Sequence, residues 1–177
     1  MSDLVSFGLL IIRVVAGLTI AAHGAQKLFG WFGGPGFAGT IAMQQKMGFR
    51  PPLLWAVLVI LGELGGGLSL ALGFLTPLGA AGMLGAMLMA IIKVHWSKGF
   101  FSSKGGFEFP LALLAIAIGV GVAGPGRYAL DSLFGIGLPS PLLFGVLALG
   151  ALIVDILGLL ISRSSAVTHR ENPSRAT

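Results

Sequence analysis

The sequence predicts an all-α fold, a polytopic transmembrane helical bundle, from its composition and from the length of its apolar stretches. Of the 177 residues, 55% are hydrophobic and only 10% are charged, whereas a soluble domain carries about 25% charged residues. Several stretches reach the roughly 20 apolar residues that cross the core of a bilayer. Helices are expected because a lipid-facing segment must satisfy its own backbone hydrogen bonds. This composition excludes a soluble enzyme.

Five apolar stretches follow one another along the chain, separated by glycine, proline and polar residues. The predicted spans are residues 4–29, 53–74, 77–96, 107–123 and 140–161, with a short interfacial helix over residues 37–49. The third span begins where Thr76 would cap a helix whose first residue is Pro77. We divide the chain into a four-helix transmembrane domain, an extra transmembrane helix and a disordered basic tail, which are residues 1–135, 136–162 and 163–177.

The distribution of charge predicts the orientation of these spans. With five spans, nearly all basic side chains fall on one side of the membrane, and the positive-inside rule places that side in the cytoplasm of a bacterial cell. The N-terminus is then outside the inner membrane and the C-terminal tail is cytoplasmic. The tryptophans near the same side are expected to form an aromatic belt. The basic residues concerned are Lys27, Lys46, Arg50, Lys93, Lys98, Lys104, Arg163, Arg170 and Arg175, and the tryptophans are Trp31, Trp55 and Trp96.

Two ionisable residues within the predicted spans have nearly the same expected depth. Arg13 and Glu63 lie about nine and about eleven residues from the outer ends of their spans, which is a difference of about 3 Å. Because a charge in a span costs about 2.5–3.5 kcal/mol, we predict a buried ion pair between them. The pair either locks two helices together or forms a polar site for substrate or protons. Asp155 has no obvious basic partner and is expected to be protonated or to face a wet groove, and Asp131 is expected to cap a short turn.

A second group of ionisable residues gathers at the cytoplasmic ends of the spans. His23 and Lys27 share one face of the first span, His95 ends the third span and Glu108 begins the fourth. We predict that these four residues bind an anionic or quinone-like head group or a partner. The alternative is that lysines such as Lys93 extend to the interface while the histidines are simply hydrogen-bonded. Because no HxxH or HExxH spacing is present, we expect no metal site.

Several short motifs follow one another in a fixed order through the first four spans. They are Arg13, Gly24-Ala25-Gln26-Lys27-Leu28, Gly62-Glu63-Leu64-Gly65-Gly66, Leu72-Gly73-Phe74-Leu75-Thr76, Lys93-Val94-His95, Glu108, Gly124-Pro125-Gly126 and Asp131. This ordered set, over roughly residues 5–132, resembles the DoxX family of small bacterial membrane proteins. The usual family pattern has four spans, so the resemblance implies a four-helix DoxX-like core to which the fifth, C-terminal helix is an addition.

The resemblance also implies a role in redox chemistry. Some relatives are linked to quinone-coupled sulfur oxidation, as a membrane subunit of thiosulfate:quinone oxidoreductase, and mycobacterial relatives to a redox-defence complex with superoxide dismutase and a sulfurtransferase. The chain has no cysteine, so a redox role needs a non-covalently bound quinone or a partner subunit.

We therefore expect a membrane subunit or scaffold of a redox complex. The alternatives are a small-molecule or proton-coupled transporter that uses Arg13 and Glu63, and a purely structural membrane partner. The expected partners are the lipid bilayer and other subunits of such a complex, with a homo-oligomer left open, and not nucleic acid. The sequence leaves open whether the chain is catalytic.

Overall fold

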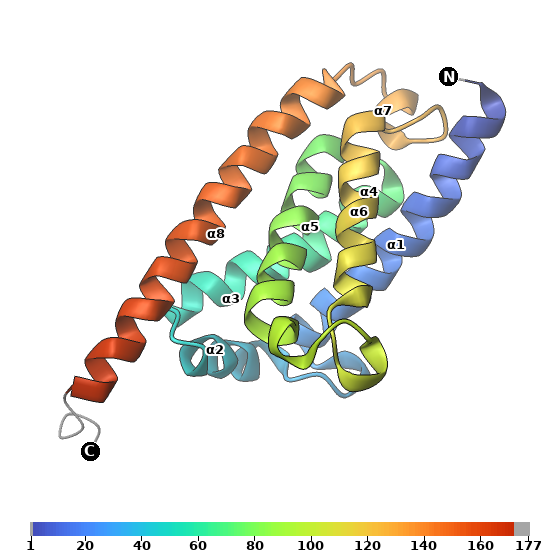
Figure 1. Cartoon of the computed structure of the whole chain (residues 1–177). Coiled ribbons are helices and arrows are strands. Elements are labelled where there is room, and N and C mark those ends of the chain that lie inside the picture. The colour runs from blue at the N-terminus through green and yellow to red at the C-terminus, as the bar shows by residue number, and fades with distance from the viewer. Residues whose placement is uncertain (1, 172–177) are drawn as a thin grey trace.

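The computed structural model describes residues 2–171 and confirms the all-α bundle. Within those residues every regular element is a helix, with no strand. Long helices lie side by side, and short helices lie at the two ends of the bundle (Figure 1). The N-terminus and the α7 loop are at one end, and α2 and the last turns of α8 are at the other.

The helices follow the predicted order along the chain. The first span is α1 (Asp3–Phe29), followed by η1 (Trp31–Gly33) and the short helix α2 (Gly36–Lys46). The second span consists of α3 (Pro52–Ile60), η2 (Leu61–Gly65) and α4 (Gly66–Leu72), and the third of α5 (Thr76–Ala90), η3 (Ile91–His95) and η4 (Trp96–Lys98). Next come η5 (Ser102–Lys104), α6 (Glu108–Ala123), α7 (Leu130–Leu133) and α8 (Ser140–Glu171).

Four of the five predicted spans are long enough to cross a bilayer. Among the described residues these are Asp3–Phe29, Pro52–Leu72, Thr76–Lys98 and Ser140–Arg163. The remaining one, α6, has 16 residues, which is fewer than the roughly 20 that a membrane-normal helix needs. It nevertheless packs in the bundle against α5 and α8, so it belongs to the same layer of apolar helices.

The C-terminal helix extends further than predicted. We expected the last span to end near residue 161 and a disordered tail over residues 163–177, but α8 continues to Glu171. A helix that leaves the membrane can continue because each added residue contributes one backbone hydrogen bond to an existing helix. Residues 172–177 of the predicted tail lie outside the described part of the chain. Figure 1 shows α8 crossing the bundle at a slant on the outside of α5.

Two spans contain π-helical turns instead of uninterrupted α-helix. The segment η2 occupies the middle of the second span and η3 the end of the third. A π-turn places one extra residue in the helix and changes the direction of the side chains near it, and such turns occur frequently at functional sites. Here η2 carries Glu63, and η3 carries Lys93 and His95. Both segments thus bear ionisable residues predicted from the sequence.

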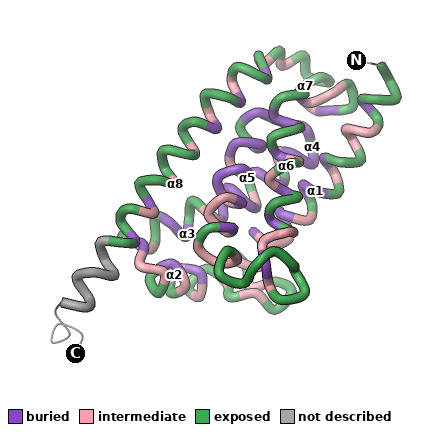
Figure 2. The backbone as a smooth tube through the Cα atoms, in the orientation of Figure 1, coloured by how far each residue is buried: buried purple, intermediate pink, exposed green. Residues whose placement is uncertain are grey.

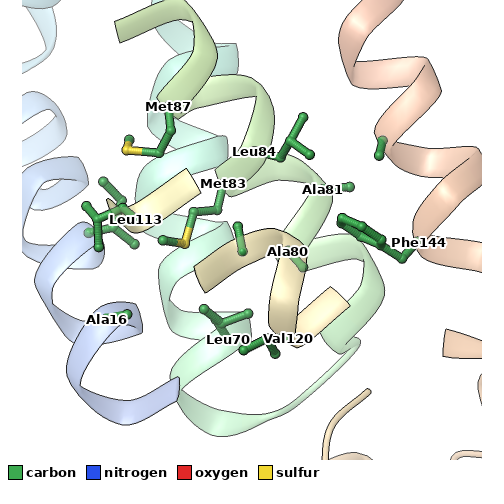
Figure 3. Packing of buried hydrophobic residues seen from close by; sticks show 13 residues of the cluster. Ala16, Leu70, Ala80, Ala81, Met83, Leu84, Met87, Leu113, Val120 and Phe144 are labelled. Atoms are coloured by element: carbon green, nitrogen blue, oxygen red, sulfur yellow. The ribbon is translucent and has the colours of Figure 1, made fainter. Parts of the chain in front are cut away.

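The apolar core is centred on α5. Its buried residues Met83 and Met87 lie among residues from the neighbouring helices, such as Leu70 of α4, Leu113 of α6 and Phe144 of α8 (Figure 3). Buried residues follow the inward faces of the helices, whereas the outward faces of the long helices are exposed (Figure 2). Those outward faces are themselves apolar, as lipid-facing surfaces must be.

Small residues bring the backbones of adjacent spans together. A Cβ atom at Gly67 of α4 would lie 2.6 Å from the Gly17 carbonyl oxygen of α1. A Cβ atom at Gly62 would lie 2.8 Å from the Gly82 oxygen of α5. Lipid tails are as apolar as leucine, so helices in a bilayer associate through such close backbone approach. Close backbone approach at these glycines therefore makes the bundle compact.

The contact between α1 and α4 gives a testable prediction on stability. Gly67→Ala should destabilise the bundle by about 1–3 kcal/mol, because the new methyl group meets backbone atoms that cannot move aside easily. Gly65→Ala in the same span is the control, since nothing lies within 4 Å of its Cβ position. Thermal unfolding of both variants in detergent measures the effect. Equal melting temperatures for the two variants would contradict the proposed packing.

Candidate functional site

A large cavity lies between the first three spans and α8. Its volume is about 850 Å³, within the range of small-molecule sites in proteins. Most of the wall is apolar, with glycine residues of α5 exposing its backbone. Side chains from α1, α2, α3, α5 and α8 contribute to the lining, including Ile20, Met43, Leu58, Met87 and Val154.

The cavity opens sideways, through the apolar outer surface of the bundle. Leu61 of η2 and Leu78 of α5 line the cavity and are 60% and 54% exposed. Val154 of α8, also in the wall, is 40% exposed. All three lie within the segments long enough to cross a bilayer. The exposed part of the lining therefore lies on the apolar spans, where lipid-soluble molecules are the ones that meet it in a membrane.

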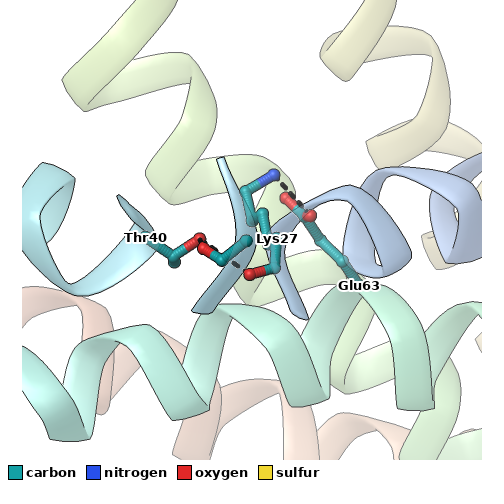
Figure 4. A network of polar contacts seen from close by, with 4 residues as sticks. Lys27, Thr40 and Glu63 are labelled. Atoms are coloured by element: carbon teal, nitrogen blue, oxygen red, sulfur yellow. Dashed lines mark hydrogen bonds and ion pairs between the residues drawn. The ribbon is translucent and has the colours of Figure 1, made fainter. Parts of the chain in front are cut away.

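An ion pair between Lys27 and Glu63 forms a polar wall of the cavity. The Lys27 Nζ atom donates to Glu63 Oε2 at 2.6 Å, and the two side chains are 18% and 5% exposed (Figure 4). Gly24 allows η2 to approach, since a Cβ atom there would lie 2.6 Å from the Cα atom of Leu64. The Thr40 hydroxyl of α2 donates to the Lys27 carbonyl oxygen at 3.0 Å. The pair is therefore fixed by three helices.

This pairing differs from the predicted Arg13–Glu63 ion pair. Arg13 is fully buried and donates from Nη1 to the Pro125 carbonyl and from Nη2 to the Tyr128 carbonyl, both at 2.6 Å. Side chains of a helix lean toward its N-terminus. In α1 this directs Arg13 to the loop at the N-terminal end and Lys27 into the bundle, whereas Glu63, on an antiparallel span, leans toward Lys27. The predicted pair rested on the depths of the backbone positions alone and did not include the direction in which each side chain leans.

Arg13 belongs to a structural clamp at the end of the bundle that carries the N-terminus. Asp131 accepts hydrogen bonds from the backbone N–H groups of Leu75 and Thr76 at 2.7 and 2.9 Å, and from the Thr76 hydroxyl at 2.7 Å. It thus caps α5 and not the short turn that the sequence suggested. Gly73, with φ of 63°, lies against the Arg13 guanidinium and accepts from the Asp131 N–H at 2.8 Å. The clamp joins α1, α4, α5 and the α6–α7 loop.

The two histidines predicted for the site line the cavity near the ion pair. The His23 ring packs against Phe109, with 5.8 Å between the ring centroids. His95 Nδ1 lies 2.6 Å from the Gly105 carbonyl oxygen. A neutral ring that donates from Nδ1 has its acceptor at Nε2. His23, Lys27 and His95, which are three of the four residues predicted for this site, therefore line one cavity.

Glu108 and Lys93 are not part of the group formed by His23, Lys27 and His95. Glu108 begins α6, half-buried, and is not among the residues that line the cavity. Lys93 lines the cavity, but its Nζ atom lies over the Phe49 ring and donates to Ser162 Oγ at 3.1 Å. Its amino group therefore joins η3 to α8. Among the described residues, no three His, Asp or Glu side chains gather as metal ligands would.

The three tryptophans near the predicted cytoplasmic ends of the spans differ in burial. Trp31 and Trp96 are 57% and 62% exposed, as residues of an aromatic belt are. Trp55 is buried, stacks on Phe49 with 5.0 Å between ring centroids, and lines the cavity. The sequence could not separate it from the other two because all three lie at similar distances from span ends.

Asp155 forms part of the cavity wall on the side of α8. Its Oδ2 atom is buried and has no hydrogen-bond partner. The sequence marks Asp155 as a lone carboxyl group in an apolar stretch but does not tell which face of the helix turns inward. The structure therefore places Asp155 in the wall of this mostly apolar cavity.

The Arg13 clamp predicts a large difference between two arginines. Arg13→Leu leaves two carbonyl oxygens without their donors and should cost about 1–3 kcal/mol for each group that stays buried. Arg127→Leu removes an ion pair with Asp3 whose side chains are 69% and 65% exposed, so its effect should not exceed about 1 kcal/mol. Arg13→Lys should not restore stability, because one ammonium group lacks the fork that reaches two carbonyls. Melting temperatures in detergent test this, and similar values for the two leucine variants would refute the clamp.

Comparison with known proteins agrees with this architecture. The model of the DoxX family matches residues 8–96, which include Arg13, Lys27, Glu63 and His95. The inner membrane protein YqjF of Escherichia coli (strain K12) is 31% identical over 135 residues, which are 75% of this chain and 96% of that protein. No solved structure gives a significant match. The apolar spans and this relative identify a multi-pass inner membrane protein. Because half of the chain matches the family model and the relative is covered almost completely, the chain belongs to the DoxX family.

Proposed function

We propose that this protein is a membrane subunit of a redox assembly and that its cavity binds a quinone-like molecule. The observation that carries the proposal is a cavity of about 850 Å³ that opens toward lipid and is bordered by the Lys27–Glu63 ion pair. A quinone needs both features, because its tail is a lipid-soluble hydrocarbon and its head group carries oxygen atoms that form hydrogen bonds.

The residues present fit such a head group. The Lys27 ammonium group has three donors, of which one is used by Glu63, so it can donate to a carbonyl oxygen. The acceptor nitrogen of His95 suits a hydroxyl group, and the aromatic rings of His23 and Phe109 suit a flat head group. When bound, a quinone would supply the electron-carrying group that a chain without cysteine does not itself have. The residues of the chain bind and orient it.

The redox partner is inferred from the family. The resemblance links some DoxX relatives to quinone-coupled sulfur oxidation, as a membrane subunit of thiosulfate:quinone oxidoreductase, and a cavity of this kind suits the same role. The end of the bundle with Lys27, His95 and the loop of residues 99–106 is where such a partner would reach the head group. We place this end in the cytoplasm because Lys46, Arg50, Lys98 and Lys104 are also there.

Neutralising the ion pair tests quinone binding. The double variant Lys27→Met/Glu63→Gln leaves no unpaired charge in the membrane, so it should remain folded. It should bind a short-chain ubiquinone at least about 10-fold more weakly than the unmodified protein, since a hydrogen bond from a charged donor is lost. Titration of the protein in lipid nanodiscs measures the affinity. Glu108→Gln, outside the cavity, is the matched control, and unchanged binding by the double variant would refute the proposed site.

A transporter based on Arg13 and Glu63 is less well supported. Arg13 is committed to two loop carbonyls, and the two residues do not pair. Transport would instead have to use Lys27 and Glu63 alone. Uptake of a solute or of protons into reconstituted vesicles that is lost in Glu63→Gln, together with no quinone binding, would replace our proposal.

The proposed orientation is tested with single cysteines, because the chain has none of its own. Ser103→Cys is in the exposed loop at the end with Lys98 and Lys104, and Gly137→Cys is in an exposed segment at the other end. In intact cells, a membrane-impermeant maleimide should label Cys at position 137 and not at position 103. Both should react after the cells are lysed, and the opposite pattern would reverse the orientation.

A further inference from the structure

We propose that Asp155 of α8 is a second polar anchor of the cavity, which binds a hydrogen-bond donor of the ligand. The site would therefore take a hydroxylated amphiphile, of phenol or quinol type, in preference to the same molecule with its hydroxyl group blocked. This inference rests on the proposed ligand-binding function of the cavity and names the chemical class of its ligand more closely.

The position of the carboxyl group is the first argument. Asp155 comes from α8, whereas Lys27 and Glu63 come from α1 and η2, so the cavity has ionisable groups from three separate helices. Opposite Asp155 on α5 is Gly85, where a Cβ atom would lie 3.7 and 3.8 Å from the two carboxylate oxygens. Gly85 adds no side chain beside the carboxyl group, and Asp155 is among the residues that line the cavity, with its Oδ2 atom itself buried.

The lack of a protein partner is the second argument. The Oδ2 atom of Asp155 is buried without a hydrogen bond, although buried polar groups are nearly always paired. Lys93 of η3 lines the same cavity, but its amino group donates to Ser162 Oγ and lies over the Phe49 ring, and it makes no hydrogen bond to Asp155. Ser162 is seven residues after Asp155, about two helical turns toward the end of α8. An unpaired acceptor in the wall of a mostly apolar cavity is suited to a donor on the ligand.

The chemistry of the cavity narrows the ligand class. A donor that reaches Asp155 must be attached to a molecule that is otherwise apolar, because the surrounding wall consists of residues such as Ala151, Val154 and Met89. A hydroxyl group on a lipid-soluble ring or chain meets both requirements. Asp155 also lies outside residues 8–96, so this anchor is contributed by the part of the chain beyond the family match.

Two ligands that differ only in one hydroxyl group test the proposal. 4-Decylphenol and 4-decylanisole have the same chain and ring, but the anisole has a methyl group in place of the phenolic hydrogen. Their affinities are measured by equilibrium dialysis against the full chain in lipid nanodiscs, with empty nanodiscs subtracted. The unmodified protein should bind the phenol about 3- to 10-fold more tightly, as expected for one added hydrogen bond.

Substitutions of Asp155 should act on this preference and not on binding in general. Asp155→Leu should remove the preference and leave the affinity for the anisole within about 2-fold, because only one hydrogen bond changes. Asp155→Asn keeps a carbonyl acceptor and should retain an intermediate preference. Ile156→Ala, on the exposed face of α8, is the control and should keep the full preference. Melting temperatures show whether Asp155→Leu is folded. If it is not, the phenol preference of Asp155→Asn tests the role of Asp155.

The results separate this inference from the proposed function. A preference for the phenol in Asp155→Leu equal to that of the unmodified protein, or no preference in the unmodified protein, overturns the role of Asp155. If ubiquinone does not bind but the preference depends on Asp155, the cavity takes a hydroxylated lipid of another class, and the inference stands while the redox function falls. If ubiquinone binding depends on Lys27 and Glu63 but substitution of Asp155 leaves the phenol preference unchanged, the proposed redox function stands and the role of Asp155 falls.

Discussion

The pairing of Lys27 with Glu63 is the interaction on which the cavity depends. A carboxylate 5% exposed in the middle of a span would be costly without a counter-charge, so α1 and η2 must stay close together. Gly24 makes this approach sterically allowed, and Thr40 connects the same region to α2. The pair therefore does two things, in that it stabilises the contact of three helices and supplies a polar wall to an otherwise apolar space.

The clamp around Arg13 solves the same problem at the other end by different means. There the charge is satisfied mainly by backbone carbonyls of a loop, and the nearby Asp131 is used to cap α5. Both Nη atoms of Arg13 and both oxygens of Asp131 are thus engaged within the protein, whereas the buried Arg13 Nε has no hydrogen-bond partner. The difference between the two ends explains why a buried arginine and a buried glutamate in the same bundle have unrelated roles, one in structure and one in the cavity wall.

The sequence predicted the all-α bundle, the order of its helices and three residues of the cavity, because each depends on local composition. Long apolar runs, glycine spacing and proline positions are local signals. The partner of Glu63 was not predicted, because it depends on the lean of side chains along two antiparallel helices and not on backbone depth. The inward direction of Asp155 was also hidden, since it depends on the rotation of α8 about its own axis. The π-turns that carry Glu63 and His95 have no recognisable signal in the sequence.

The fifth span completes the cavity that the first three begin. Without α8, the face of α5 that carries Gly82 and Gly85 would be open to lipid, and the ion pair would border a shallow groove. With α8 packed across α5, Ala151, Val154 and Asp155 form another wall, and the groove becomes an enclosed space with a lateral opening. Contacts near both ends of α8 determine its slant, with Phe144 over Gly121 at one end and Gly158 against Trp55 toward the other. Between these points α8 packs against α5, where Ala151 and Asp155 lie next to Gly85, and the absence of a side chain at Gly85 accommodates the Asp155 carboxyl group in the cavity wall.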